Sequence, residues 1–248
     1  MINKPRSLYI IGILLFSAGI FFGIVLLGYF SWAKLESIFY FGYTYRADQP
    51  YISLVCPRIM KPTEVQPIKL TLKNPGNYAV SPPFQIYISH GNSMRTIDDS
   101  ASLAPGQIQK FKWDLTAKEA TFERMILIKV YVNPTADLKR RTATCAVVVI
   151  DLLGLSGSQV LLLWLGLCLV CLAGWGWIWN QLQAYRLTHY IDQDNTMTTM
   201  AIILLCGIIS NLLGIWLLGV VLLIIAVFMV GIALVNLTRL ALHSGKVT

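Results

Sequence analysis

The sequence predicts a membrane protein in which four transmembrane helices carry one extracytoplasmic, all-β domain. Three observations lead to this fold class. Only 13% of the 248 residues are charged and 56% are hydrophobic, whereas about a quarter of a soluble domain is charged. The apolar residues concentrate before residue 31 and after residue 150. Between these regions, apolar and polar residues alternate with the period of two that is typical of β-strands.

The first apolar segment, residues 8–30, carries no charge. About 20 apolar residues suffice to cross the hydrocarbon core of a bilayer, so residues 1–30 are predicted to form a short tail and the first transmembrane helix. A cleaved signal peptide is the alternative, but its apolar core would span only about 7–15 residues. The length of the segment favours an uncleaved anchor.

The second apolar segment predicts a transmembrane helix over residues 158–180. It ends in Trp175, Trp177 and Trp179. Indole rings favour the head-group layer of a membrane. We therefore expect these three tryptophans to form an aromatic belt at the interface.

The third apolar segment, residues 196–238, is too long for one helix and fits two. Ser210, Asn211 and Gly214 interrupt it, which predicts a helical hairpin with Asn211 solvated in the turn. One long span with a re-entrant piece is the alternative.

The orientation follows from the basic residues near the ends of the spans. These residues are Lys4, Arg6, Arg186, Arg239 and Lys246. The positive-inside rule places both termini, the loop at 181–195 and the tail at 239–248 in the cytoplasm. The β domain then lies outside. It contains no Asn-x-Ser/Thr sequon, which fits a bacterial plasma membrane.

The β domain is predicted over residues 51–152. Its expected strands are residues 68–72, 84–88, 111–115, 126–132 and 143–150, each with one apolar and one polar face. Turn-forming Asn, Pro and Gly residues separate them. Such strands and turns over about 100 residues are typical of an immunoglobulin-type sandwich.

Two turn motifs also resemble those of a known domain family. Residues 70–76 read LTLKNPG, residues 84–88 read FQIYI, and residues 103–106 read LAPG. This pattern resembles CARDB domains, the adhesion-related bacterial sandwiches. The resemblance implies the sandwich fold and little about activity, because this architecture serves many functions.

Two of the five cysteines, Cys56 and Cys145, lie near the start and in the last strand of the β domain. If first and last strands are neighbours in an oxidising compartment, these two can form a disulfide. Two unpaired buried thiols are the alternative.

No motif points to catalysis, a cofactor or a metal. The three histidines, His90, His189 and His243, are far apart in the chain, and no Gly-rich phosphate loop, HExxH or GxSxG occurs. The predicted spans contain no charged residue, which argues against a pump or coupled transporter. We expect neither an enzyme nor a cofactor.

The net charge of +8 is not concentrated in an arginine-rich helix, so nucleic acid is not an expected partner. One basic patch, Lys139, Arg140 and Arg141, precedes the last strand. We expect this triplet to supply at most electrostatic contacts at the rim of an interface. The basic balance of the middle region as a whole favours attraction to anionic lipid head groups or to an acidic protein surface.

Two features suggest contacts with other membrane-protein subunits. Gly19 and Gly23 form a GxxxG motif, which lets helix backbones approach closely. The linker at residues 31–50 is rich in aromatic residues, among them Phe39, Tyr40 and Phe41. Aromatic side chains are enriched at interface cores, although a collar in the head-group layer is the alternative reading.

The leading hypothesis is therefore a non-catalytic accessory or scaffold subunit of a membrane complex, which contacts partners through its helices and outer sandwich. The alternative is a stand-alone adhesion or ligand-binding membrane protein. A transporter component is the least supported.

Overall fold

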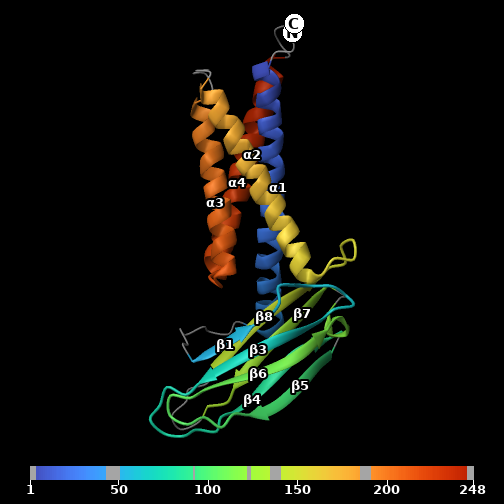
Figure 1. Ribbon diagram of the computed structural model, residues 1–248, viewed down its shortest axis with the longest axis vertical. Coiled ribbons are helices and arrows are strands. Elements are labelled where there is room, and N and C mark those ends of the chain that lie inside the picture. Colours follow the sequence, from blue (N-terminus) through green and yellow to red (C-terminus); the bar gives the residue numbers. More distant parts are fainter. Residues whose placement is uncertain are drawn as a thin grey trace. The chain divides into compact units, whose positions relative to one another are not determined.

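The structure is a computed structural model that describes residues 4–42, 51–91, 93–121, 124–134, 141–184 and 191–244. The chain forms two compact units (Figure 1). One consists of Met1–Ser31 and Leu162–Thr248, and the other of Trp32–Leu161.

The described residues include four long α-helices. These are α1 (Lys4–Phe41), α2 (Gly157–Ala184), α3 (Ile191–Leu212) and α4 (Trp216–Ser244). Each contains a stretch long and apolar enough to cross a membrane: Ser7–Phe41, Gly157–Leu182, Asn195–Leu212 and Trp216–Ala233. The four apolar helices expected from the sequence are therefore present.

Helix α1 differs from the prediction at its carboxyl end. Residues 31–41, expected to belong to an aromatic linker, continue the helix to Phe41. This segment contains no Gly or Pro, and Ala33, Leu35 and Glu36 favour helix. Gly42, with φ of +75°, then terminates it as left-handed glycines commonly do.

Within the helical unit, α1 packs closely against α2 and α3. A Cβ atom on Gly19 would lie 2.8 Å from Leu172 of α2, and one on Gly23 would overlap Leu204 of α3. Leu27 is fully buried and lies against Gly207 of α3. Small residues on α1 and α3 thus admit large side chains from neighbouring helices.

The hairpin between α3 and α4 forms where Ser210, Asn211 and Gly214 predicted a break. Gly214 supplies the turn with φ of +85°. The expectation that Asn211 is solvated is wrong, because its side chain is only 3% exposed and its Nδ2 donates to Ser31 Oγ at 3.2 Å. Asn211 still belongs to the last turn of α3, which directs its amide toward α1.

The tryptophans of α2 also differ from the expected belt. Trp175 and Trp179 are 6% and 7% exposed, whereas Trp177 is 66% exposed. Trp175 packs on Phe16 of α1 with ring centroids 5.0 Å apart. Residues four apart share one face of a helix, and a residue between them points elsewhere. Only Trp177 is therefore placed to face the surroundings.

The β domain contains two sheets within the described residues (Figure 1). The strands are β1 (Ile52–Val55), β2 (Ile59–Met60), β3 (Val65–Lys73), β4 (Pro83–His90), β5 (Ser93–Ser100), β6 (Ile108–Thr116), β7 (Met125–Val132) and β8 (Arg141–Val149). One sheet has the order β1-β3-β6 and the other β2-β8-β7-β4-β5. All pairs are antiparallel except β2 with β8.

A single hydrophobic core lies between the two sheets. Ile68 and Leu70 of β3 share it with Phe84 of β4, Ile128 of β7 and Val147 of β8, and all five are fully buried. The intervening residues along these strands point away from the core, as alternation requires. The predicted period of two thus corresponds to the actual inner and outer faces.

The two turn motifs that resemble CARDB domains contact each other. Asn74 is 1% exposed, and its Nδ2 donates to the carbonyls of Tyr78 at 2.7 Å and Leu103 at 3.1 Å. Gly106 N donates to Asn74 O at 3.1 Å. A buried amide satisfied in this way stabilises both turns together.

Candidate functional site

The end of α1 is fastened to the outer face of the five-stranded sheet. Lys34 Nζ donates to Thr144 of β8, to the carbonyl and, at 3.0 Å, to Oγ1. Lys129 Nζ of β7 donates to Phe41 O at 3.3 Å and lies 5.8 Å from the centroid of the Phe41 ring. A cation at a helix carboxyl end satisfies a free carbonyl and complements the helix dipole.

A cleft of about 300 Å³ lies beside this attachment. Its lining residues are Tyr40, Phe41, Tyr87, Met94, Lys129 and Tyr131. Tyr87 and Lys129 are direct cross-strand neighbours, and the Tyr87 hydroxyl donates to Gln85 Oε1 at 2.6 Å. The lining offers aromatic faces, hydroxyl groups and an ammonium group but no carboxylate, histidine or cysteine.

The start of α2 is fastened to the β domain by Glu64. The Glu64 Oε2 atom accepts hydrogen bonds from Lys61 N at 3.1 Å and Gly157 N at 3.0 Å, and Oε1 accepts one from the Gln66 amide. Burial alone would raise the pKa of Glu64, but these hydrogen bonds and the Lys61 charge outweigh it and lower the pKa below its usual value. A carboxylate at a helix amino end is stabilised by the free N–H groups there.

Gly157 has no room for a side chain. A Cβ atom there would overlap the backbone carbonyl of Ile59 in β2. The neighbouring loop is held by Lys61, whose Nζ donates to Gly154 O at 3.1 Å. The first turn of α2 is therefore packed directly against the β2 backbone.

The disulfide expected from the sequence is present between Cys56 and Cys145. Cys56 lies between β1 and β2, where the chain passes from the three-stranded to the five-stranded sheet, and Cys145 lies in β8. Their Cα atoms are 6.4 Å apart, and both residues are partly exposed. The bond thus joins β8 to the segment that connects the two sheets.

Gly19 and Gly23 do not present a free seam to a partner. Both face side chains of the same chain, Leu172 and Cys171 for Gly19 and Leu204 and Cys168 for Gly23. The close approach that these two glycines allow is used by α2 and α3 of the same chain, and a partner contact there stays a prediction.

The three aromatic residues at the end of α1 have different surroundings. Phe39 is 80% exposed. Tyr40 and Phe41 line the cleft, and their ring centroids are 5.1 Å apart. Of the three predicted contact residues, Phe39 is the one placed to meet a partner directly.

The predicted basic patch is only partly described, because Lys139 and Arg140 lie outside the described residues. Arg141 begins β8, and its guanidinium lies 4.6 Å from the centroid of the Tyr51 ring. Its Nε and Nη1 atoms are buried without an acceptor among the described residues. Burial lowers the pKa of Arg141, against an opposing effect of Tyr51. Arg141 is therefore not a freely solvated surface charge.

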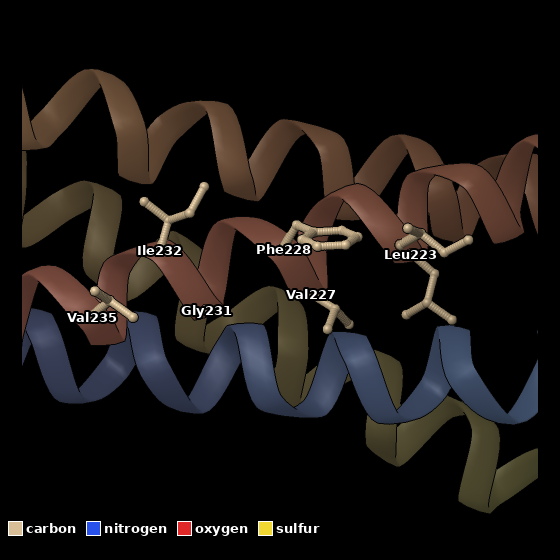
Figure 2. A pocket seen from close by; sticks show the side chains of 7 residues that line it. Leu223, Val227, Phe228, Gly231, Ile232 and Val235 are labelled. Atoms are coloured by element: carbon tan, nitrogen blue, oxygen red, sulfur yellow. The ribbon is translucent and has the colours of Figure 1, made fainter.

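An apolar groove of about 770 Å³ runs along α4. Figure 2 shows that Phe228 and Ile232 project to one side of Gly231, and Val227 and Val235 to the other. Phe228 is 68% and Ile232 61% exposed, whereas Ala226 on the same helix is 2% exposed. No described atom beyond its immediate helix surroundings lies within 4 Å of a Cβ placed on Gly231.

The comparisons with known proteins bear on the β domain. No family model and no curated protein matches the chain. A CARDB domain from Pyrococcus furiosus, solved in complex with di-metal ions, is 19% identical over 44% of this chain and 98% of its own length, with a TM-score of 0.33. The β domain resembles a CARDB domain. A β-glucosidase from Listeria innocua is 16% identical over 40% of this chain and 16% of its own length, with a TM-score of 0.31.

In the parts of the chain that the structure describes, no three His, Cys, Asp or Glu side chains are placed to hold a metal ion. The residues that sequence reasoning missed are fastening residues: Lys34, Lys129, Glu64 and Gly157. The outward position of Lys129 on its strand was predictable from alternation, but its helical partner depends on the course of α1 beyond residue 30.

Proposed function

We propose that the four apolar helices cross a bacterial plasma membrane, with both termini in the cytoplasm and an immunoglobulin-like sandwich outside. The basic residues that flank the apolar segments support this orientation. So does the Cys56–Cys145 disulfide, because disulfides persist mainly in oxidising compartments. Long domains are exported regardless of their charge, so the basic character of the β domain is no obstacle.

We further propose that the protein is a non-catalytic accessory or scaffold subunit of a membrane complex. The observation that carries this proposal is the groove on α4 around Gly231. A glycine inside a helix costs roughly 1 kcal/mol relative to alanine, and Gly231 receives no close neighbour from the described part of the chain. Such a glycine would let the backbone of a partner helix approach closely. Contact with lipid chains gives the glycine no such role.

The β domain supports the same proposal. Its attachments to α1 and α2 fix the exposed Phe39 relative to the sheet. A rigid aromatic side chain outside the membrane suits a partner surface, because aromatic anchors account for much of the affinity of interfaces. We therefore expect partner subunits to contact both α4 and the end of α1.

A larger side chain at Gly231 tests docking at the α4 groove. Gly231→Leu should release the protein from its complex, because the new side chain occupies the space of the partner helix. Gly166→Leu on α2 is the matched control, since Gly166 also has no neighbour within 4 Å. Blue native electrophoresis of mild-detergent extracts reports the complex. If the complex stays intact in both variants, the result contradicts docking at α4.

The cleft beside Phe41 favours a second candidate, a stand-alone adhesion or ligand-binding protein. Its aromatic lining and volume suit a small chemical group. This candidate predicts a protein that purifies alone, with cell attachment that Tyr131→Ala abolishes. A transporter component remains the least supported, because the apolar cores of the spans carry no charge.

A further inference from the structure

The Cys56–Cys145 disulfide lies between the two places where helices are fastened to the β domain. Cys145 directly follows Thr144, whose carbonyl and hydroxyl accept the hydrogen bonds from Lys34 of α1. Cys56 shortly precedes β2, and Lys61 directly follows that strand. Lys61 and Glu64 hold Gly154 and Gly157 at the start of α2. One covalent bond therefore connects the attachment of α1 with that of α2.

The other links between these attachments are few. Strand β2 has only two residues, and its register with β8 is Ile59 opposite Val148 and Met60 opposite Val149. Two backbone hydrogen bonds flank this pairing, from Val148 N to Arg58 O and from Ile150 N to Met60 O, each 2.9 Å long. A disulfide across a sequence separation of 89 residues restrains the chain more than either hydrogen bond does.

We propose that this disulfide is a redox-controlled latch that sets how firmly the β domain holds α1 and α2. Both cysteines pack against the hydrophobic core and are partly exposed. The reductant is a small dithiol on the side of the membrane where we propose that the β domain lies. Its thiolate attacks one sulfur and forms a mixed disulfide, and its second thiolate resolves it. The latch gains two electrons and two protons and becomes two thiols, while the reductant becomes a disulfide.

Opening the latch changes the restraint on both helices at once. The segment after Cys56 is then held to β8 by the short β2 pairing and by the packing of Met60 in the core. Thr144 keeps its pairing with β7 but loses its covalently fixed neighbour. Helices α1 and α2 continue from these attachments into their apolar segments. The reduced state therefore holds the β domain less firmly on both helices. This inference goes beyond the accessory role and does not depend on it, but it rests on the proposed placement of the β domain outside the cytoplasm.

Hydrogen exchange of the full-length protein in detergent tests the latch. Treatment with dithiothreitol should raise amide exchange about tenfold in two segments, residues 34–41 of α1 and residues 157–161 of α2. Exchange in the β4–β5 hairpin should not change, because it lies at the other edge of the five-stranded sheet. The Cys56→Ser/Cys145→Ser variant should show the raised rates without reductant and no further response to it.

Lys34→Met provides a second variant, which should raise exchange at the end of α1 alone. Unchanged exchange in both helical segments after reduction would overturn the proposal. So would a response of only one segment, since the latch connects the two. A rise throughout the β domain, including β4 and β5, would also overturn it, because the disulfide would then maintain the fold as a whole.

Discussion

At the scale of single residues, the attachments depend on charged groups placed at helix ends. Lys129 lies at the carboxyl end of α1 and Glu64 at the amino end of α2, as the helix dipole favours. Neither role was legible from the sequence. In the sequence, each residue is one polar side chain among many. Its role depends on a helix end that is distant in the sequence and lies beside it only in the folded structure.

Replacing Glu64 tests the attachment of α2. Glu64→Gln should lower the stability of the β domain by about 1 kcal/mol at pH 7, as the loss of a helix cap does. Because folding lowers the pKa of Glu64 from 4.5, the carboxylate stabilises the fold above that pH. Its contribution is lost as the pH falls through the lower, folded-state pKa. The variant and the parent should therefore converge in strongly acidic solution.

Thermal unfolding between pH 7 and pH 2 measures this difference. Asp114→Asn is the control, because Asp114 is an exposed carboxylate on β6. A constant difference between Glu64→Gln and the parent across this range would show that the charge of Glu64 does not matter.

At the scale of elements, the sequence predicted the helices and the strands with strong periodicity. It did not predict the short strands β1 and β2. It also did not predict β5, whose residues SMRTIDDS are nearly all exposed. An edge strand has neighbours on one side only, so selection for apolar residues on its inner face is weak. The helical end of α1 was missed because aromatic residues near a membrane predict an interface rather than a continued helix.

The packing of α1 is tested by paired glycine substitutions. Gly19→Ile should destabilise the isolated protein by about 1–3 kcal/mol, the range for overpacked cores. The new isoleucine side chain would collide with Leu172. Gly28→Ile should have little effect, since no atom lies within 4 Å of its Cβ position. Thermal unfolding in detergent measures both. If Gly19→Ile unfolds normally but leaves the complex, the seam belongs to a partner after all.

At the scale of the whole molecule, the chain combines a β domain with four helices long and apolar enough to cross a membrane. CARDB-like turns predicted the domain because Asn74 and Gly106 build a contact that depends on local sequence. The function could not be predicted equally well, since partner surfaces such as the α4 groove consist of ordinary apolar residues. What distinguishes the α4 surface is the groove around Gly231, which no described side chain fills and which only the structure shows.

The orientation is tested by labelling introduced cysteines in a background without free thiols. A membrane-impermeant maleimide added to cells should label Tyr78→Cys, because Tyr78 is exposed on the β domain. It should not label Asn195→Cys at the start of the third apolar segment until the cells are permeabilised. Labelling in the reverse order would place the β domain in the cytoplasm.

The central claim is that this protein is one subunit of a membrane complex, and native mass spectrometry tests it most directly. The tagged protein is expressed at its natural level and extracted in mild detergent. The account predicts particles that contain this chain with other membrane subunits in fixed ratio, and that lose these subunits when Gly231→Leu is introduced. Particles that contain only this chain, under conditions that keep a known complex of the same membrane intact, would contradict it.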